Sequence, residues 1–461
     1  MSNTARPSTA YGLKTAVLSS IETFAQSVAG IAPSAAPAMT AAIVYGMAGN
    51  GAWLAYLMAT AVMTLTAICI NEYASRSSSP GALYAYASRG AGVYGGFVTG
   101  WSMLIAYILA VSCCSVQFAV FANEVLKTLH VNLLPPLALA AGCVLLTGFV
   151  GVQNIKLSAE LMLWLEIASI VIIGALTGTI LFQHGFSLDF NQLKLAGVNG
   201  QGISMGLVMA MFAFVGFESA ATLGAEAESP LQKIPQAMLS SVMLAGAFFI
   251  ITTYAIVLGF SHLLEKLATC TTPLVVLSNS LGLAWMGRLT NIGAAVSFFA
   301  CTLAMTNAGA RILMTMASQG YFPQRLAWIH PKNQTPMVAV AVTSTCGVAP
   351  IVVLLSSGYG LMDIVGWLGT MSTYGYLVAY TLVSASMPFY LKKLGALKPR
   401  HTAVSTIAVL AVLAGCAGTM CPLPPAPYCW LPLMSAGYVA TGLLYCRFVI
   451  SRGHEDQLAR D

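Results

Sequence analysis

Charged side chains are scarce in this sequence. Only 7% of its 461 residues are Asp, Glu, Lys or Arg, whereas 58% are hydrophobic. A soluble globular domain carries about 25% charged residues, because its surface has to face water. The scarcity excludes a soluble fold and predicts a chain whose surface mostly faces lipid.

Motifs of several soluble functions are also missing. The sequence has no GxxxxGK[ST] phosphate-binding loop, no CxxC and no His/Cys cluster with metal-ligand spacing. Its net charge of +6 comes from scattered basic residues, without a patch interleaved with aromatics. None of the six histidines falls inside a long apolar run, so no buried catalytic base is evident. We therefore expect no enzyme activity, no metal, no cofactor and no nucleic-acid partner.

Most of the eleven cysteines lie within apolar runs, where Cys behaves as a small hydrophobe. Cys421 and Cys429 differ, because they flank the Pro-rich loop CPLPPAPYC. A disulfide between them is open if this loop is periplasmic. We favour two free thiols.

Apolar runs long enough to cross a bilayer recur along the chain. A helix needs about 20 apolar residues to cross the hydrocarbon core. We therefore predict an all-α, polytopic membrane protein with twelve transmembrane helices. The predicted spans are 15–47, 52–73, 92–124, 133–153, 157–183, 202–226, 236–261, 287–318, 337–356, 362–388, 402–420 and 428–448.

The basic residues orient these spans. Cytoplasmic loops carry an excess of Lys and Arg. With both termini in the cytoplasm, 16 of the 20 basic residues lie in inner segments, and Lys127, Lys194, Lys266 and Arg288 lie in outer ones. We expect a ten-helix core at 15–388, two additional helices at 402–448, and cytoplasmic tails at 1–14 and 449–461, in a cell inner membrane.

Two predicted spans contain a helix-breaking sequence near their middle. The first reads SVAGIAPSAAPAM, with Gly30, Pro33, Ser34 and Pro37, and the sixth carries Gly216 in FAFVGFESA. Unwound backbone survives in a membrane only where it is buried in protein or lines a cavity. Gly and Pro are also common in membrane helices, but breaks in matching spans are typical of carriers built from inverted repeats. The repeats would be 15–183 and 202–388.

Three carboxylates lie well inside predicted spans: Glu22, Glu166 and Glu218. A charge at such depth costs a few kcal/mol, and no Lys or Arg lies at comparable depth. Glu218 is a candidate to link the two breaks or to titrate as substrate binds. Glu166 is a candidate proton site, with a hydrogen-bonded structural role as the equal alternative. Glu22 lies nearer the membrane interface.

Four stretches together resemble the amino acid–polyamine–organocation (APC) family of permeases. They are GIAPS in the first span, SPGALYAYASRGAGVYGGFVTGW at 79–101, FAFVGFESAATLGAEAESPLQKIPQA at 212–237 and NAGARILMTMASQGYFPQRLAWIHPKNQTP at 307–336. The resemblance implies a leucine-transporter-like fold, with a 5+5 inverted repeat plus two C-terminal helices.

The resemblance also implies a substrate site at the two breaks. A substrate carboxylate would meet backbone N–H groups of Ala29, Gly30, Ile31, Ala32, Pro33 and Ser34, Pro33 itself having none to offer. The amine would meet carbonyls near Phe214, Val215, Gly216 and Phe217. Aromatic side chains would close over the site, with Phe212, Phe214, Phe217 and Tyr107 as candidates; core or lipid packing is the alternative for Tyr107.

Two departures from the family pattern bear on coupling and substrate. Some proton-coupled relatives carry a Lys in the fifth span, whereas the ionisable residue deep in that span here is Glu166. Span 8 carries Met305 and Asn307 rather than a Trp, which disfavours arginine and polyamines. We predict a secondary transporter for an amino acid or related small amine, by proton symport or exchange, in contact with membrane lipid. A polyamine importer of the same fold and a channel-like solute pathway are the alternatives, and the coupling ion and oligomeric state stay open.

Overall fold

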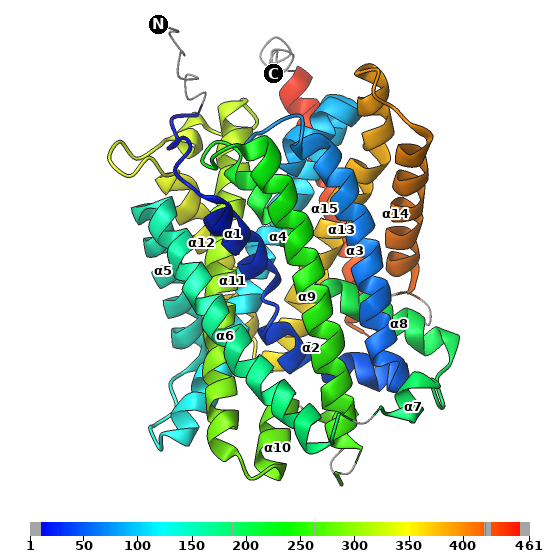
Figure 1. Ribbon diagram of the computed structural model, residues 1–461. Coiled ribbons are helices and arrows are strands. Elements are labelled where there is room, and N and C mark those ends of the chain that lie inside the picture. Colours follow the sequence, from blue (N-terminus) through cyan, green and yellow to red (C-terminus); the bar gives the residue numbers. More distant parts are fainter. Residues whose placement is uncertain are drawn as a thin grey trace, which may run out of the picture.

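The computed structural model describes residues 11–186, 188–261, 263–264, 266–270, 272–418, 420 and 426–451. These residues form a bundle of long helices (Figure 1), and the only β pairing among them is an isolated bridge between Leu18 and Ala227. Cys421 lies outside the described residues, so the question whether it pairs with Cys429 lies outside them too. The helices are α1 Ser20–Ile31, α2 Ala35–Ala48, α3 Ala52–Ala74, α4 Leu83–Thr128, α5 Pro136–Gln153, α6 Ile155–Gln183, α7 Phe190–Leu193, α8 Gly200–Phe212, α9 Pro230–Phe260, α10 Pro273–Ser280, α11 Ala284–Ser318, α12 Met337–Ser356, α13 Leu361–Lys393, α14 Pro399–Gly418 and α15 Leu431–Ser451, with 3-10 turns η1 Gly49–Gly51, η2 Phe217–Leu223, η3 Leu267–Thr269, η4 Gln324–Ala327 and η5 Tyr428–Trp430.

The all-helical, membrane-spanning class is confirmed. Ten segments among the described residues are long and apolar enough to cross a membrane. One of them, Ser20–Ala74, contains two of the predicted spans, and the polar-rich α13 is not among the ten. The exact count of twelve spans stays a prediction.

The helix breaks occur at the predicted residues. α1 ends at Ile31 and α2 begins at Ala35, with Ala32 in the left-handed region at φ 50°. Pro33 has no N–H to continue the helical hydrogen-bond pattern, so the break follows from the local sequence. In the sixth span α8 ends at Phe212, and Gly216 (φ 100°) precedes the 3-10 turn η2.

The third long helix begins before its predicted span. α4 starts at Leu83, but its backbone is non-helical at Gly92, where φ is 77°. A positive φ is readily adopted only by glycine. Gly92 therefore separates a short preceding helix from the membrane-crossing part that the sequence predicted from 92 onward.

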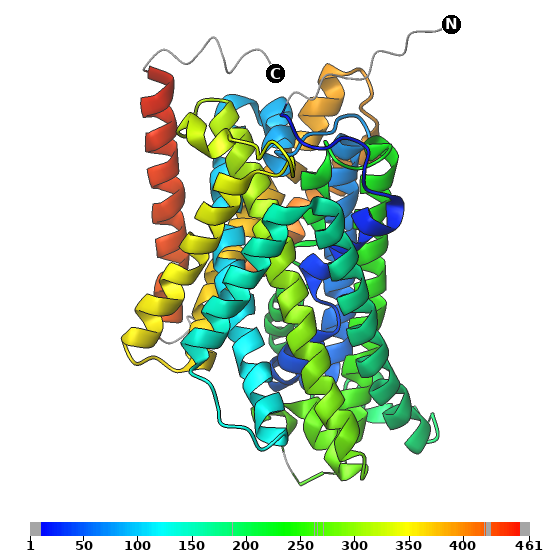
Figure 2. The same ribbon diagram turned by 90° about the vertical axis from the view of Figure 1, so that its left-hand side faces the viewer.

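The broken helices lie inside the bundle. α4 packs against both α11 and α13, while α1 contacts α6, α9 and α11. In Figure 2 α15 stands at one edge, and only Leu431, Gly442 and Cys446 of this helix are buried. The described chain begins and ends at the same end of the bundle (Figures 1 and 2).

Candidate functional site

The two breaks meet through their glycines. A Cβ atom on Gly30 would lie 2.4 Å from the carbonyl oxygen of Gly216, and one on Gly216 would lie 2.6 Å from the carbonyl oxygen of Gly30. No real side chain tolerates such distances. The two backbones therefore approach this closely only because both positions are glycine.

Side chains from each broken span hold backbone carbonyls of the other. Ser27 in α1 donates a hydrogen bond to the Phe217 carbonyl, and Ser219 in η2 donates to the Gln26 carbonyl at 3.0 Å. The thiol of Cys301 in α11 lies 3.4 Å from the Gly30 carbonyl oxygen. The last four carbonyls of a helix have no intrahelical partner, and the Cys301 thiol lies against one of them, that of Gly30.

Glu218 is enclosed by hydrogen-bond donors and is fully buried. The hydroxyl of Tyr107 donates to its carboxylate at 2.8 Å, the hydroxyl of Tyr380 donates to the other oxygen, and the N–H of Gly216 donates at 3.2 Å. Within the described part of the chain, Glu218 has no cationic partner. Tyr107 thus lies at the centre of the bundle and does not face lipid. Tyr380, in α13, was not singled out from the sequence.

Glu166 connects three elements. Its side chain, 2% exposed, projects from α6 and accepts a hydrogen bond from Ser297 of α11 at 2.7 Å. The Ser34 hydroxyl at the first break lies 3.5 Å from the other carboxylate oxygen, and Ser169 donates to Ser34 at 2.7 Å. Glu166 therefore contacts the first break directly, as Glu218 contacts the second.

A cavity of about 60 Å³ lies beside the breaks. This space holds a few water molecules, so an amino acid enters only if its walls move. Five predicted site residues line the cavity: Gly30, Ile31, Ala32, Phe212 and Val215. The other lining residues come from four helices and from the position after α8: Ala36, Met39 and Thr40 of α2; Ala110, Cys113, Cys114 and Gln117 of α4; Ala213 after α8; Phe298, Cys301 and Met305 of α11; and Gly369, Ser372 and Tyr376 of α13.

The remaining predicted residues pack behind this wall. Phe214 forms an edge-to-face contact with Phe249, at a ring separation of 5.0 Å, and Phe217 lies 5.5 Å from the ring of Tyr380. A role for these residues in substrate contact stays a prediction. The residues outside the direct lining are Ala29, Pro33, Ser34, Tyr107, Phe214, Gly216 and Phe217.

Five of the nineteen residues that line the cavity carry sulfur, which the sequence did not indicate. Met39 and Met305 line it together with Cys113, Cys114 and Cys301. The Sγ atoms of Cys114 and Cys301 lie 3.4 Å apart. These cysteines occupy apolar spans as expected, but helix packing gathers three of them around one space.

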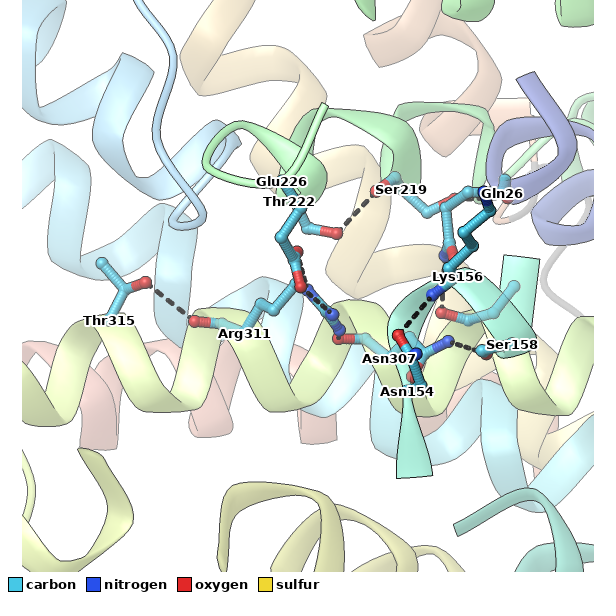
Figure 3. Close-up of polar contacts among 11 residues, drawn as sticks. Gln26, Asn154, Lys156, Ser158, Ser219, Thr222, Glu226, Asn307, Arg311 and Thr315 are labelled. Carbon is cyan, nitrogen blue, oxygen red and sulfur yellow. Dashed lines mark hydrogen bonds and ion pairs between the residues drawn. The ribbon is translucent and has the colours of Figure 1, made fainter. Parts of the chain in front are cut away.

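A buried ion pair lies toward the end of the bundle where the described chain begins. Nε and Nη2 of Arg311 each donate to a Glu226 oxygen at 2.7 Å, and the two side chains are 1% and 0% exposed. Figure 3 shows the Arg311 guanidinium turned from α11 toward Glu226. Nη1 of Arg311 also donates to the Asn307 carbonyl at 2.9 Å. Arg311, one of the basic residues of the predicted inner segments, is thus buried within the protein.

Glu226 also binds the segment that precedes α1. Its carbonyl accepts hydrogen bonds from the N–H groups of Val17 and Leu18, at 2.9 and 3.1 Å. The side chain and backbone of this residue therefore join α11, the segment after η2 and the segment before α1. At this end of the bundle, Glu226 therefore connects both broken spans to α11.

The acids near the bundle end have structural partners. Glu22 accepts a hydrogen bond from the Ser19 N–H at 2.6 Å in a capping box, and Lys156 Nζ lies 3.9 Å away. A direct role for Glu22 in coupling gains no support from this geometry. The Lys233 ammonium, 2.6 Å from Glu228, lowers the pKa of that exposed carboxyl by hydrogen bonding and charge.

Long apolar helices, two of them broken where they meet beside a cavity, are the architecture of a multi-pass membrane transporter. The model of the amino acid permease family matches residues 23–423, and the chain belongs to this family. It is therefore a transporter and not an enzyme.

Several curated relatives share most of this chain. The branched-chain amino acid permease BcaP of Bacillus subtilis is 24% identical over 75% of this chain and 75% of its own length. The low-affinity putrescine importer PlaP of Escherichia coli K12 is 23% identical over 76% and 75%. Cationic amino acid transporter 4 of Mus musculus is 26% identical over 80% of this chain, which covers 59% of that longer protein.

A solved structure supports the leucine-transporter-like fold. A mutant of the Eremococcus coleocola manganese transporter superposes with a TM-score of 0.56, at 13% identity, over 97% of this chain and 98% of that one. At this identity the likeness concerns the fold alone.

Proposed function

We propose that this protein moves an amino acid or a related small amine across the inner membrane, by proton symport or by exchange. The observation that supports it most is the contact of Gly30 and Gly216 beside the cavity. Helix ends at such breaks offer N–H groups on one side and carbonyls on the other. These partial charges suit a zwitterion without a buried charged side chain.

The proposed substrate contacts are the backbone of residues 29–34 and of residues 212–217. Five lining residues from these two segments, named above, would contact the solute directly. The excess of Lys and Arg in the predicted inner loops supports cytoplasmic termini.

Glu218 and Glu166 are the proposed proton-coupling groups. Both are buried, and each contacts one of the two breaks. Neither has a cationic partner among the described residues. Buried ionisable groups in membrane proteins commonly mark proton or substrate pathways. A proton on either carboxylate would change its hydrogen bonds to the break it contacts.

A polyamine importer of the same fold is the second candidate. The similarity to a protein named as a putrescine importer favours it. That protein and the branched-chain permease are almost equally similar to this chain, so overall identity does not separate the two substrates.

Proteoliposomes test the proposal. Purified protein should take up radiolabelled substrate when the lumen is preloaded with the same solute, and an imposed inward proton gradient should increase uptake if protons are coupled. Saturable counterflow distinguishes a carrier from a channel. If a panel of amino acids and amines shows neither counterflow nor proton-driven uptake, the proposal is refuted.

Carboxylate variants test the coupling groups. Glu218→Gln and Glu166→Gln should each abolish the response to the proton gradient, because a glutamine cannot exchange a proton. Counterflow should persist in any variant that still binds substrate. Glu160→Gln is the matched control, since Glu160 lies exposed on the same helix as Glu166. A normal gradient response in Glu218→Gln would remove Glu218 from the coupling mechanism.

A further inference from the structure

We propose that the cavity selects amino acids with a neutral, apolar side chain and rejects cationic amino acids and polyamines. This inference rests on the proposed transport function and narrows it to one substrate class. It is drawn from the chemistry of the cavity wall, because the relatives' names point to different substrates.

Among the residues that the structure describes, no charged side chain lines the cavity. The described lining contains no Asp, Glu, Lys, Arg or His. The two nearby buried carboxylates are outside the lining, and both are already hydrogen-bonded: Glu218 to Tyr107, Tyr380 and Gly216, and Glu166 to Ser297. A second ammonium group on a bound solute would have no carboxylate to pair with in the wall.

The few polar groups of the wall are already engaged. Thr40 donates to the Ala36 carbonyl at 2.8 Å, and Ser372 donates to the Ala106 carbonyl at 2.7 Å.

Two further donors of the wall contact sulfur. Gln117 Nε2 lies 3.1 Å from the Met39 sulfur, and the Tyr376 hydroxyl lies 3.1 Å from the Met305 sulfur. A second ammonium group buried here would find no carboxylate and few oxygen acceptors in the wall, so only part of its hydration would be replaced, which is costly. Attraction to an aromatic face such as Phe212 recovers only a part of that loss.

The rest of the wall favours an apolar side chain. Ile31, Met39, Val215 and Met305 present methyl, methylene and thioether groups. Methionine side chains are flexible and adapt to ligands of different shape. The walls therefore can yield to an aliphatic or thioether side chain while the zwitterionic end of the solute stays at the breaks.

A ligand panel on the wild-type protein tests the selectivity. Leucine, isoleucine, valine and methionine should raise its melting temperature and compete for uptake in proteoliposomes. Lysine, arginine and putrescine should compete at least about tenfold more weakly, a difference of about 1.4 kcal/mol in binding free energy. Equal or stronger competition by the cationic compounds would overturn the inference and leave the proposed transport function intact. No binding or uptake of any compound would instead overturn the transport function itself.

A charge-adding variant tests the cause. Met39→Glu places a carboxylate in the wall with little change of volume, and Met39→Gln is its uncharged control. The ratio of lysine to leucine affinity should rise at least about tenfold in Met39→Glu relative to Met39→Gln. An unchanged ratio in a folded variant would show that wall charge does not set selectivity. The wild-type panel decides the selectivity even if the variant does not fold.

Discussion

Breaking the buried Arg311–Glu226 pair should strongly destabilise the protein. Both side chains are at most 1% exposed, and two hydrogen bonds of 2.7 Å join them. Glu226→Met would leave the guanidinium buried with two donors unpaired. Removing one partner of a buried ion pair costs about 3–5 kcal/mol, because an uncompensated charge remains. We expect a loss of this size in the free energy of unfolding.

The double variant distinguishes the cost of an unpaired buried charge from the cost of changed side-chain packing. Replacing both Arg311 and Glu226 by Met removes both buried charges, and such replacements are often close to neutral. The single variants should therefore be much less stable than the double variant, with a coupling energy of about 3 kcal/mol or more. Arg76→Met is the control, because Arg76 pairs with Glu72 at 2.6 Å but is 33% exposed. An exposed pair contributes about 0–1 kcal/mol.

Equilibrium unfolding in mixed micelles of a mild detergent and SDS, followed by tryptophan fluorescence, measures these differences. The reasoning fails if the effects of the two single substitutions simply add in the double variant. It also fails if Arg311→Met costs no more than Arg76→Met.

Two further predictions concern the breaks and the cavity. Gly30→Val should lower counterflow at least about tenfold, because its side chain would collide with the Gly216 backbone. Gly178→Val is the control and should transport normally, because a side chain at this position in α6 meets open space. Equal activity of the two variants would contradict the close approach of Gly30 and Gly216. Substrate should slow the reaction of Cys114 with a maleimide, since this thiol lines the cavity, but should not protect the exposed Cys346; equal rates with and without substrate would place the solute elsewhere.

Local sequence predicted the helix breaks but only part of the site. Pro33 and Gly216 determine the backbone at their own positions, so both breaks could be placed from the chain alone. Glu166 and Glu218 were identified as buried acids from their depth in apolar spans. Their partners were not, because Tyr380 lies 162 residues from Glu218 and Ser297 lies 131 residues from Glu166. Only helix packing decides which side chains meet over such distances.

The sequence by itself determined that this protein spans a membrane as a helical bundle with two broken helices. These properties depend on the length of apolar runs and on Gly and Pro at single positions, which act locally. The tertiary structure alone decided that Gly30 and Gly216 touch, that Arg311 pairs with Glu226, and that the cavity wall is apolar and sulfur-rich. Each of these contacts depends on how neighbouring helices are rotated and shifted relative to one another. Composition does not encode that rotation, because a helix that is apolar on all sides has no strongly preferred buried face.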